Sequence, residues 1–191
     1  MTVEHRPHPP WAQRQEVRVG LIVAVALAIA VVVWLVAIRG GGGGSSKATT
    51  ASIAPTSASP DRLRSLAKDT GHPIYWIGPA ANTTYELTKT SSGRIFVRYL
   101  TKGVAIGTST SYTFIGTYPF ADAYSTLKGL AKKGDDESFD APADGLAVYS
   151  KDRPTNIYLA YPDSNVEIEV FDPSPSRARS LIREGRIAPV Q

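Results

Sequence analysis

Histidine is the side chain best suited to proton transfer near neutral pH, and this chain has three, His5, His8 and His72. His72 stands between Gly71 and Pro73, where it is either a general base or a loop residue after a helix, whose dipole favours a cation. The pattern favours the loop residue. His5 and His8 are three residues apart, but the surrounding prolines prevent a helix that would bring both to one face. We therefore expect no metal site in that stretch.

Carboxylates gather in one short stretch, and calcium binds such oxygen atoms. The five residues are Asp135, Asp136, Glu137, Asp140 and Asp144. Their spacing is not that of an EF-hand, so the pattern favours a solvated acidic loop, residues 134–145, over a cation site.

Several classes of chemistry are excluded by composition. The chain has no cysteine, which excludes a thiol nucleophile, a disulfide scaffold and cysteine-based zinc or iron–sulfur sites. It contains no G-x-S-x-G, phosphate-loop, dinucleotide or H-E-x-x-H motif. Residues 61–191 carry 16 Lys and Arg against 15 Asp and Glu, a balance that gives no support for nucleic-acid binding. We predict no metal and no cofactor, and we assign no catalytic residue.

Other residues are candidates for binding a partner. Arg153 lies in the segment Asp152–Asn156 and is either presented to a carboxylate or phosphate, or simply part of a capped β-turn. The tyrosines and Trp76 form either a stacking surface for glycan or peptide, or ordinary core and sheet packing, which is the default. These tyrosines are Tyr75, Tyr85, Tyr99, Tyr112, Tyr118, Tyr124, Tyr149, Tyr158 and Tyr161. Asn82 begins a glycosylation sequon, meaningful only in a eukaryotic secretory setting.

The elements that must position these residues lie in 61–191. A helix is predicted from the N-cap Ser59 and Pro60 to Gly71, with further helices over 120–133 and 176–184. Strands are predicted over 74–77, 83–89, 94–100, 112–118, 146–150, 156–161 and 166–171. Runs of strands between helices predict an α+β fold with a largely antiparallel sheet. A strand, a proline and a helix recur at a constant offset of 54 residues: Pro119 and Leu127 correspond to Pro173 and Leu181. This repetition indicates either two β-β-β-α halves or a chance match.

The segment Val19–Ile38 predicts one membrane-spanning helix. It has 20 uncharged residues between Arg18 and Arg39, enough for a helix of about 30 Å, the thickness of a bilayer core. A cleaved signal peptide is the main alternative, but the run is long and Arg39 follows directly. Residues 1–18 then form a short tail. Residues 39–60, rich in Gly, Ser, Thr and Pro, form a flexible linker that spans on the order of 25 Å.

Arginines on the two flanks set the expected orientation. Three arginines precede the apolar segment, whereas one arginine and one lysine follow it. This weak positive-inside bias predicts a cytoplasmic N-terminus and a C-terminal domain outside the cell membrane.

Several stretches resemble single-pass envelope proteins of actinobacterial type. These are GHPIYWIGP, TTYELT, GRIFVRYL, GTYPFADAY, VYSKDRPTNIYLAYP and VEIEVFDPSP, and they extend over about residues 63–190. The resemblance implies an extracytoplasmic α+β domain. No activity comes with it, so it carries over no catalytic or binding residue.

Two functions follow as hypotheses. The first is a membrane-anchored, non-enzymatic domain that binds a protein or an envelope component, and the second is an envelope hydrolase or carbohydrate-active enzyme that uses Asp and Glu. Two carboxylates about 5–10 Å apart in a deep cleft would favour the enzyme. A shallow surface with an aromatic or apolar patch would favour binding. A third hypothesis, a structural subunit that uses its transmembrane helix as an interface, has the least support.

Overall fold

A computed structural model describes residues 54–191 of the chain. The predicted tail, the predicted membrane helix Val19–Ile38 and most of the predicted linker lie outside the described residues. Within 54–191, no helix is both long enough and apolar enough to cross a membrane.

The first described helix, α2 (Pro60–Thr70), begins and ends as its sequence predicts. The Ser59 hydroxyl accepts a hydrogen bond from the backbone N–H of Arg62 at 3.1 Å, so Ser59 is the N-cap. Gly71 ends the helix in the left-handed conformation, with φ of 67°. Leu63 and Leu66 form the buried side of the helix.

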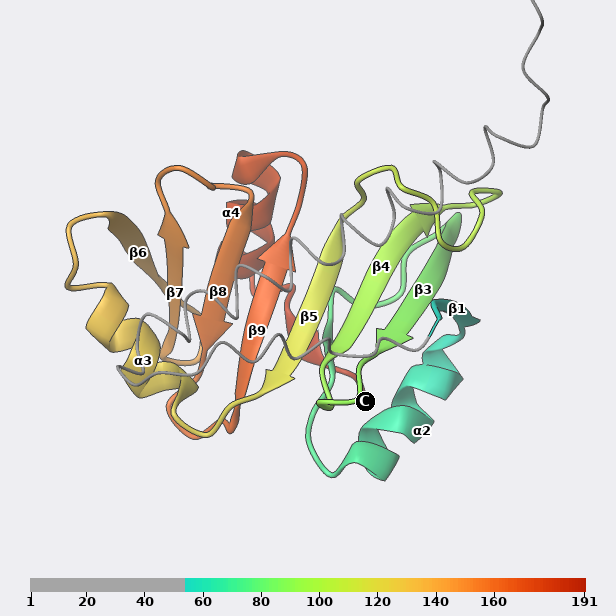
Figure 1. Cartoon of the computed structure of the whole chain (residues 1–191), viewed down its shortest axis with the longest axis horizontal. Helices are drawn as coiled ribbons and strands as arrows, with labels where there is room; N and C mark the ends of the chain where they lie inside the picture. The colour runs from blue at the N-terminus through green and yellow to red at the C-terminus, as the bar shows by residue number, and fades with distance from the viewer. Residues whose placement is uncertain (1–53) are drawn as a thin grey trace, which may run out of the picture. The chain divides into compact units, whose positions relative to one another are not determined.

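Eight strands form one antiparallel sheet in the order β1-β3-β4-β5-β9-β8-β7-β6 (Figure 1). Their bounds are Thr56–Ala58, Thr83–Lys89, Ile95–Thr101 and Phe114–Pro119 for β1, β3, β4 and β5, and Asp136–Ala141, Gly145–Ser150, Asn156–Ala160 and Val166–Phe171 for β6 to β9. Two short strands, β2 (Tyr75–Trp76) and β10 (Ala188–Pro189), pair separately. The predicted α+β class with a large antiparallel sheet is confirmed for the described residues.

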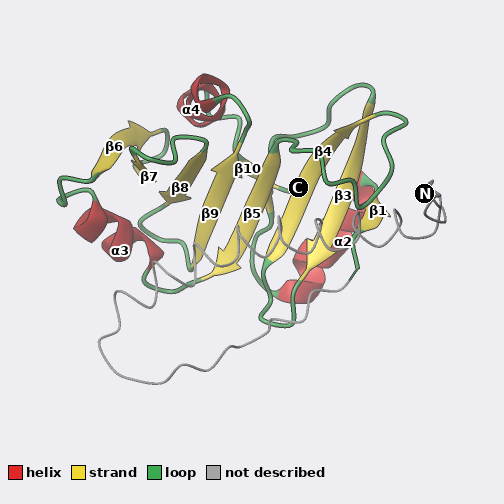
Figure 2. Ribbon diagram, turned by 45° about the horizontal axis from the view of Figure 1, so that its top comes forward, coloured by secondary structure: helices red, strands yellow, loops and turns green. Residues whose placement is uncertain are grey.

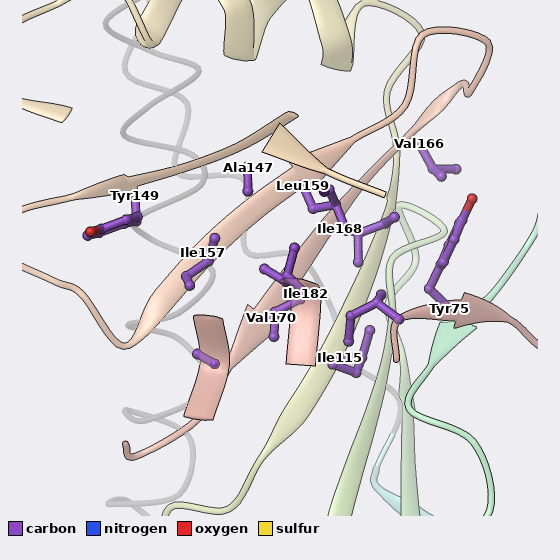
Figure 3. Close-up of a cluster of buried hydrophobic side chains, with 13 residues drawn as sticks. Tyr75, Ile115, Ala147, Tyr149, Ile157, Leu159, Val166, Ile168, Val170 and Ile182 are labelled. Carbon is purple, nitrogen blue, oxygen red and sulfur yellow. The ribbon is translucent and has the colours of Figure 1, made fainter. Parts of the chain in front are cut away.

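One face of the large sheet is covered by α2, by α4 (Pro175–Arg183) and by the β2–β10 pair. Ala178 and Ile182 of α4 pack with Ile115, Ile157 and Val170 of the sheet in a core that Figure 3 shows. A second core on the same face joins α2 to β3 and β4 and contains Leu63, Leu66, Leu87, Ile95 and Val97.

Helix α3 (Ala123–Leu130) covers part of the opposite face (Figure 2). It packs against β7, β8 and β9. Its buried Leu127 and Leu130 belong to neither of the two cores just described. We call this opposite face the second face of the sheet. Helix α3 covers it over β7, β8 and β9, and its central strands carry the polar residues described below.

Four differences from the sequence prediction have a physical reason, and the other boundaries shift by one or two residues. The acidic stretch predicted as a loop contains the edge strand β6, because exposed carboxylates also suit an edge strand. Strand β1 lies inside the predicted linker and pairs with β3. Helix α3 begins at Ala123, after Phe120, whose N–H bonds to the carbonyl of Asn165 at 2.8 Å, and it ends at Leu130. Strand β5 includes Pro119, which lies beyond the residues that pair with β4, so its missing N–H is not needed there.

Candidate functional site

The register of the central strands places polar and aromatic side chains together on the second face. Side chains along a strand alternate between the two faces of the sheet. Ile115 and Val170 point toward the core under α4, so the residues next to them in β5 and β9 point to the opposite face. Glu86, Arg98, Phe114, Phe171 and Asn156 form one cross-strand row. Thr88, Phe96, Gly116, Glu169 and Tyr158 form the next.

Glu169 of β9 is the centre of a polar group that we call the glutamate cluster, made of Arg94, Tyr118, Asn156, Tyr158 and Glu169. Glu169 is completely buried. Its Oε2 accepts a hydrogen bond from the Tyr118 hydroxyl, and its Oε1 accepts one from Asn156 Nδ2 at 2.5 Å. The cluster thus joins strands β5, β8 and β9 through one carboxyl group.

Burial raises the pKa of the Glu169 carboxyl, although the two hydrogen bonds and the positive charge of Arg94 oppose that rise. Burial and the neighbouring Glu169 carboxyl also raise the pKa of the Tyr118 hydroxyl well above its ordinary value. Tyr118 therefore remains a hydrogen-bond donor throughout the physiological pH range.

Gly116 makes room for this hydrogen bond. It pairs with Glu169 across the two strands, and Tyr118 lies two residues further along β5 on the same face. A Cβ atom at position 116 would lie 2.7 Å from the Tyr118 hydroxyl oxygen and 2.9 Å from Tyr118 Cζ. The tyrosine ring therefore occupies the space that any other residue at 116 would fill.

Within residues 54–191, two buried polar atoms of the cluster have no hydrogen-bond partner, Arg94 Nη1 and the Tyr158 hydroxyl. The Arg94 guanidinium lies over the Tyr118 ring at 5.6 Å from its centroid. Tyr158 pairs with Glu169 across β8 and β9, and burial followed by the charge of Glu169 raises the pKa of its hydroxyl. Both atoms retain a capacity for hydrogen bonding that no group of the described part of the chain uses.

Three phenylalanines lie beside the cluster, and we call them the phenylalanine strip. Phe114 of β5 stacks on Phe171 of β9, with ring centroids 5.0 Å apart and planes 18° apart. Phe96 of β4 meets the edge of Phe114 at 6.0 Å. Phe114 and Phe171 are partly exposed, whereas Phe96 is buried. The strip presents aromatic carbon at the centre of a sheet face.

Arg98 and Glu86 flank the strip. Arg98 Nη1 lies 2.5 Å from Glu86 Oε1, and the Glu86 side chain is buried. This ion pair joins β3 to β4 on the same face as Phe114.

The residues proposed from sequence lie elsewhere. His72 follows α2, with Nδ1 3.0 Å from the carbonyl oxygen of Pro73. It lines a shallow hollow of about 500 Å³ together with Arg64, Lys68 and Val190. The structure does not bring His72 to the glutamate cluster or to the phenylalanine strip.

The acidic residues 135–144 lie on or beside the edge strand β6, where Glu137 accepts a hydrogen bond from Tyr149. Within residues 54–191, no group of three or more His, Cys, Asp or Glu residues is arranged to hold a metal ion. His5 and His8 lie outside the described residues.

Arg153 lies in a turn, where its N–H bonds to the carbonyl of Ser150 and its own carbonyl accepts from the N–H of Asn156. The β-turn interpretation of this segment is therefore confirmed, and its last residue, Asn156, belongs to the glutamate cluster. Asn82 is exposed and adopts a positive φ of 53°.

Most of the tyrosines that were candidates for a stacking surface serve packing. Tyr85 and Tyr99 meet edge to face at 5.3 Å, and their hydroxyls accept backbone hydrogen bonds from Ala80 and Ile77. Trp76 is buried against Tyr85. Tyr118 and Tyr158, in contrast, belong to the glutamate cluster.

Sequence reasoning did not find Arg94, Gly116 or Glu169. The alternation in Val166–Phe171 predicts a strand but not its neighbours in the sheet. The central position that buries Glu169 is set by distant parts of the chain. One signal was available, since a glycine inside the strand pattern YTFIGTY marks a close approach by another group. Comparisons with protein-family models, with curated proteins and with solved structures found no match to this chain.

Proposed function

We propose that the chain is a single-pass membrane-anchored protein whose domain, residues 61–191, lies outside the cell membrane and binds a protein or an envelope component without catalysis. The anchor in this proposal is the uncharged segment Val19–Ile38, and the orientation follows from the arginines on its N-terminal side. The near balance of charge in residues 61–191 argues against a nucleic acid as the partner.

The observation that supports binding is the phenylalanine strip. Phe114 and Phe171 keep part of their rings exposed although they lie on the two central strands of the sheet. Exposed aromatic carbon beside an arginine is typical of an interaction surface, because a partner gains by covering the rings and by bonding the guanidinium. Arg94 and Arg98 are both partly exposed and supply such groups.

Photo-crosslinking in intact cells tests this proposal. A photoreactive phenylalanine analogue is placed at position 114 and, as a matched control, at position 139. Phe139 is a partly buried phenylalanine beneath Arg183 on the face that α4 covers. We expect a discrete crosslinked product from position 114 and none from position 139. Equal products at both positions, or none at either, would refute binding through the strip.

External protease added to the same cells tests the topology separately. We expect residues 61–191 to be degraded while the cells remain intact. Protection of these residues would overturn the extracytoplasmic location.

A second candidate function, an envelope hydrolase, has one observation in its favour. Glu167 and Glu169 lie on the same face of β9, two residues apart, a separation of about 7 Å along a strand. That spacing lies within the range of paired catalytic carboxylates. Against it, both carboxyl oxygens of Glu169 already accept hydrogen bonds from the protein. Release of soluble fragments from purified cell-wall polysaccharide, abolished by Glu169→Gln, would favour the enzyme.

We also propose that β3-β4-β5 and β7-β8-β9 descend from equivalent β-β-β-α halves. The two runs meet at β5 and β9, the third strand of each, which supports a pseudo-twofold axis normal to the sheet. The likeness between the halves extends to the strands only. A twofold axis normal to the sheet would place both helices on the same face, whereas α3 and α4 lie on opposite faces. Superposition of the two three-stranded runs tests the proposal, since unrelated strand twist and spacing would contradict it.

A further inference from the structure

We infer that the arginines of α4 dock the domain on the anionic phospholipid head groups of the membrane that anchors the chain. The inference rests on the proposed membrane anchor and adds a lipid contact, which determines the face of the domain that points toward the bilayer. It concerns Arg179, Arg183 and Arg186, which we call the α4 arginines.

Positive charge is concentrated at α4. Residues 175–186 contain four arginines and one glutamate, a net charge of +3, whereas residues 61–191 as a whole carry 16 Lys and Arg against 15 Asp and Glu. The rest of the domain is therefore negative by two charges. Figure 2 shows α4 standing out from the sheet, where its side chains can meet a surface.

The α4 arginines carry charge that the described part of the chain does not neutralise. Arg177 is paired, since its Nε lies 3.2 Å from Asp172 Oδ2. Among residues 54–191, no ion pair includes an α4 arginine. Each of these arginines can therefore attract an anion from outside the domain.

Aromatic rings hold two of the guanidinium groups in place. The Arg183 guanidinium lies over the Phe139 ring at 4.8 Å from its centroid, and that of Arg179 lies over the Tyr149 ring at 5.7 Å. A guanidinium stacked on a ring keeps its planar edge of N–H donors for a phosphate, which it matches with two parallel hydrogen bonds. Arg179 and Arg183 are four residues apart in one helix, so their charges repel each other. A phosphate bound beside both would relieve this repulsion.

The tether keeps phospholipid head groups within reach of α4. The proposed membrane helix ends at Ile38 and β1 begins at Thr56, so residues 39–55 join them. A flexible chain of this length spans on the order of 20 Å. That span is less than the width of the domain, whose radius of gyration is about 14 Å for its number of residues. The bilayer is therefore the anionic partner with the highest effective concentration.

This orientation agrees with the binding function proposed above. Helix α4 and the phenylalanine strip lie on opposite faces of the sheet. Docking through α4 turns the strip away from the bilayer, where a protein can reach it. Position 139 remains a suitable control for protein crosslinks, because Phe139 lies beneath Arg183 on the side that faces lipid.

Fluorescence quenching of the full chain in lipid nanodiscs tests the inference. The chain has no cysteine, so Ser180→Cys, at an exposed position of α4, provides one site for a bimane label. Ser125→Cys, at an exposed position of α3, is the matched reporter on the second face. The discs contain phosphatidylcholine alone, or phosphatidylcholine and phosphatidylglycerol at seven to three, with a small share of lipid that is spin-labelled at the head group as the quencher.

Quenching should depend on lipid charge and on position. We expect strong quenching at position 180 in the discs that contain phosphatidylglycerol, and little in phosphatidylcholine alone. Salt at about 0.5 M should remove the quenching, because it screens charges beyond a few ångströms. Position 125 should show little quenching in either kind of disc.

Charge variants locate the contact. Arg179→Gln combined with Arg183→Gln should lower the ratio of docked to undocked chain about thirtyfold. Arg179→Lys combined with Arg183→Lys keeps both charges and should retain most of the docking. Lys132→Gln combined with Lys133→Gln removes the same charge from exposed positions just after α3 and should leave docking unchanged. If the glutamine variant at α4 does not fold, the lipid and salt dependence of the original chain still decides.

Several results would overturn the inference: equal quenching at position 180 in the two kinds of disc, quenching that persists in salt, stronger quenching at position 125, or equal losses in the two glutamine variants. If α4 does not dock but position 114 crosslinks to a protein and external protease degrades residues 61–191, the inference fails while the proposed function stands. If the chain does not remain in the discs on gel filtration, the proposed anchor fails and the inference fails with it.

Discussion

Replacing Gly116 by alanine tests whether the Tyr118–Glu169 hydrogen bond depends on the missing side chain. The added Cβ would lie 2.7 Å from the Tyr118 oxygen and 3.4 Å from Glu169 Cβ, so the tyrosine must move. A hydrogen bond to a carboxyl group contributes about 1.5–3 kcal/mol, and the tight fit adds about 1 kcal/mol. Reduced freedom of the unfolded chain returns about 0.4–1 kcal/mol. We expect the free energy of unfolding to fall by about 2–3 kcal/mol.

The assay is urea unfolding of the full chain in micelles, followed by near-ultraviolet circular dichroism. Gly129→Ala is the matched control, because Gly129 is an exposed glycine inside α3 and no atom lies within 4 Å of its ideal Cβ. That variant should be more stable by about 0.5–1 kcal/mol.

A double variant identifies the clash. Tyr118→Phe removes the hydroxyl oxygen that the new Cβ would meet, and with it the hydrogen bond to Glu169. Cζ, which would lie 2.9 Å from the new Cβ, remains in that variant. If the lost hydrogen bond is the main cost, adding Gly116→Ala to Tyr118→Phe should therefore cost only about 1 kcal/mol, from this remaining contact. Fully additive losses, or a Gly116→Ala loss below about 1 kcal/mol, would refute the reasoning.

Three further changes have defined outcomes. Since burial raises the pKa of Glu169 in the folded state, its contribution to stability is complete below the unfolded pKa and declines as the pH rises through the folded pKa. Glu169→Gln should therefore flatten the fall in the free energy of unfolding as the pH rises above about 4, and an unchanged profile would contradict this. Ser59→Ala should cost about 1 kcal/mol through loss of the α2 N-cap, with Ser65→Ala, at an exposed position inside the helix, as the nearly neutral control; equal effects would exclude a capping role. Leu127→Ala should lower the free energy of unfolding by about 2–5 kcal/mol, whereas Lys128→Ala should change it by less than about 0.5 kcal/mol, and similar values would mean that α3 does not bury Leu127 against the sheet.

Local sequence patterns predicted most elements because their signals are local. Ser59, Pro60 and Gly71 define α2, and alternation predicted β3, β4 and β9 within a residue or so. Strand β6 was missed because its carboxylates read as a loop, although an edge strand needs only one paired side.

The candidate site could not be predicted in the same way. Glu169 lies in β9, Tyr118 in β5 and Arg94 just before β4, so the pairings of β5 with β9 and with β4 bring them together. Nothing in the local pattern of these strands specifies those pairings. The sequence alone therefore emphasised His72 and the acidic stretch, which are conspicuous by residue type but lie apart from the glutamate cluster.

The pairing of β5 with β9 also has a consequence for how the chain folds. Most other neighbouring pairs in the eight-stranded sheet join consecutive strands, and β1 and β3 pair Ala58 with Tyr85 across α2. The longest separation is that of β5 and β9, which pair Phe114 with Phe171 and Pro119 with Val166 across the strands β6, β7 and β8. Closing so long a loop costs entropy before its contacts form, so this junction is expected to control the folding rate. The Tyr118–Glu169 hydrogen bond crosses the junction, and it can form only after the two runs of strands have met. Its formation thus marks the joining of the two runs of strands.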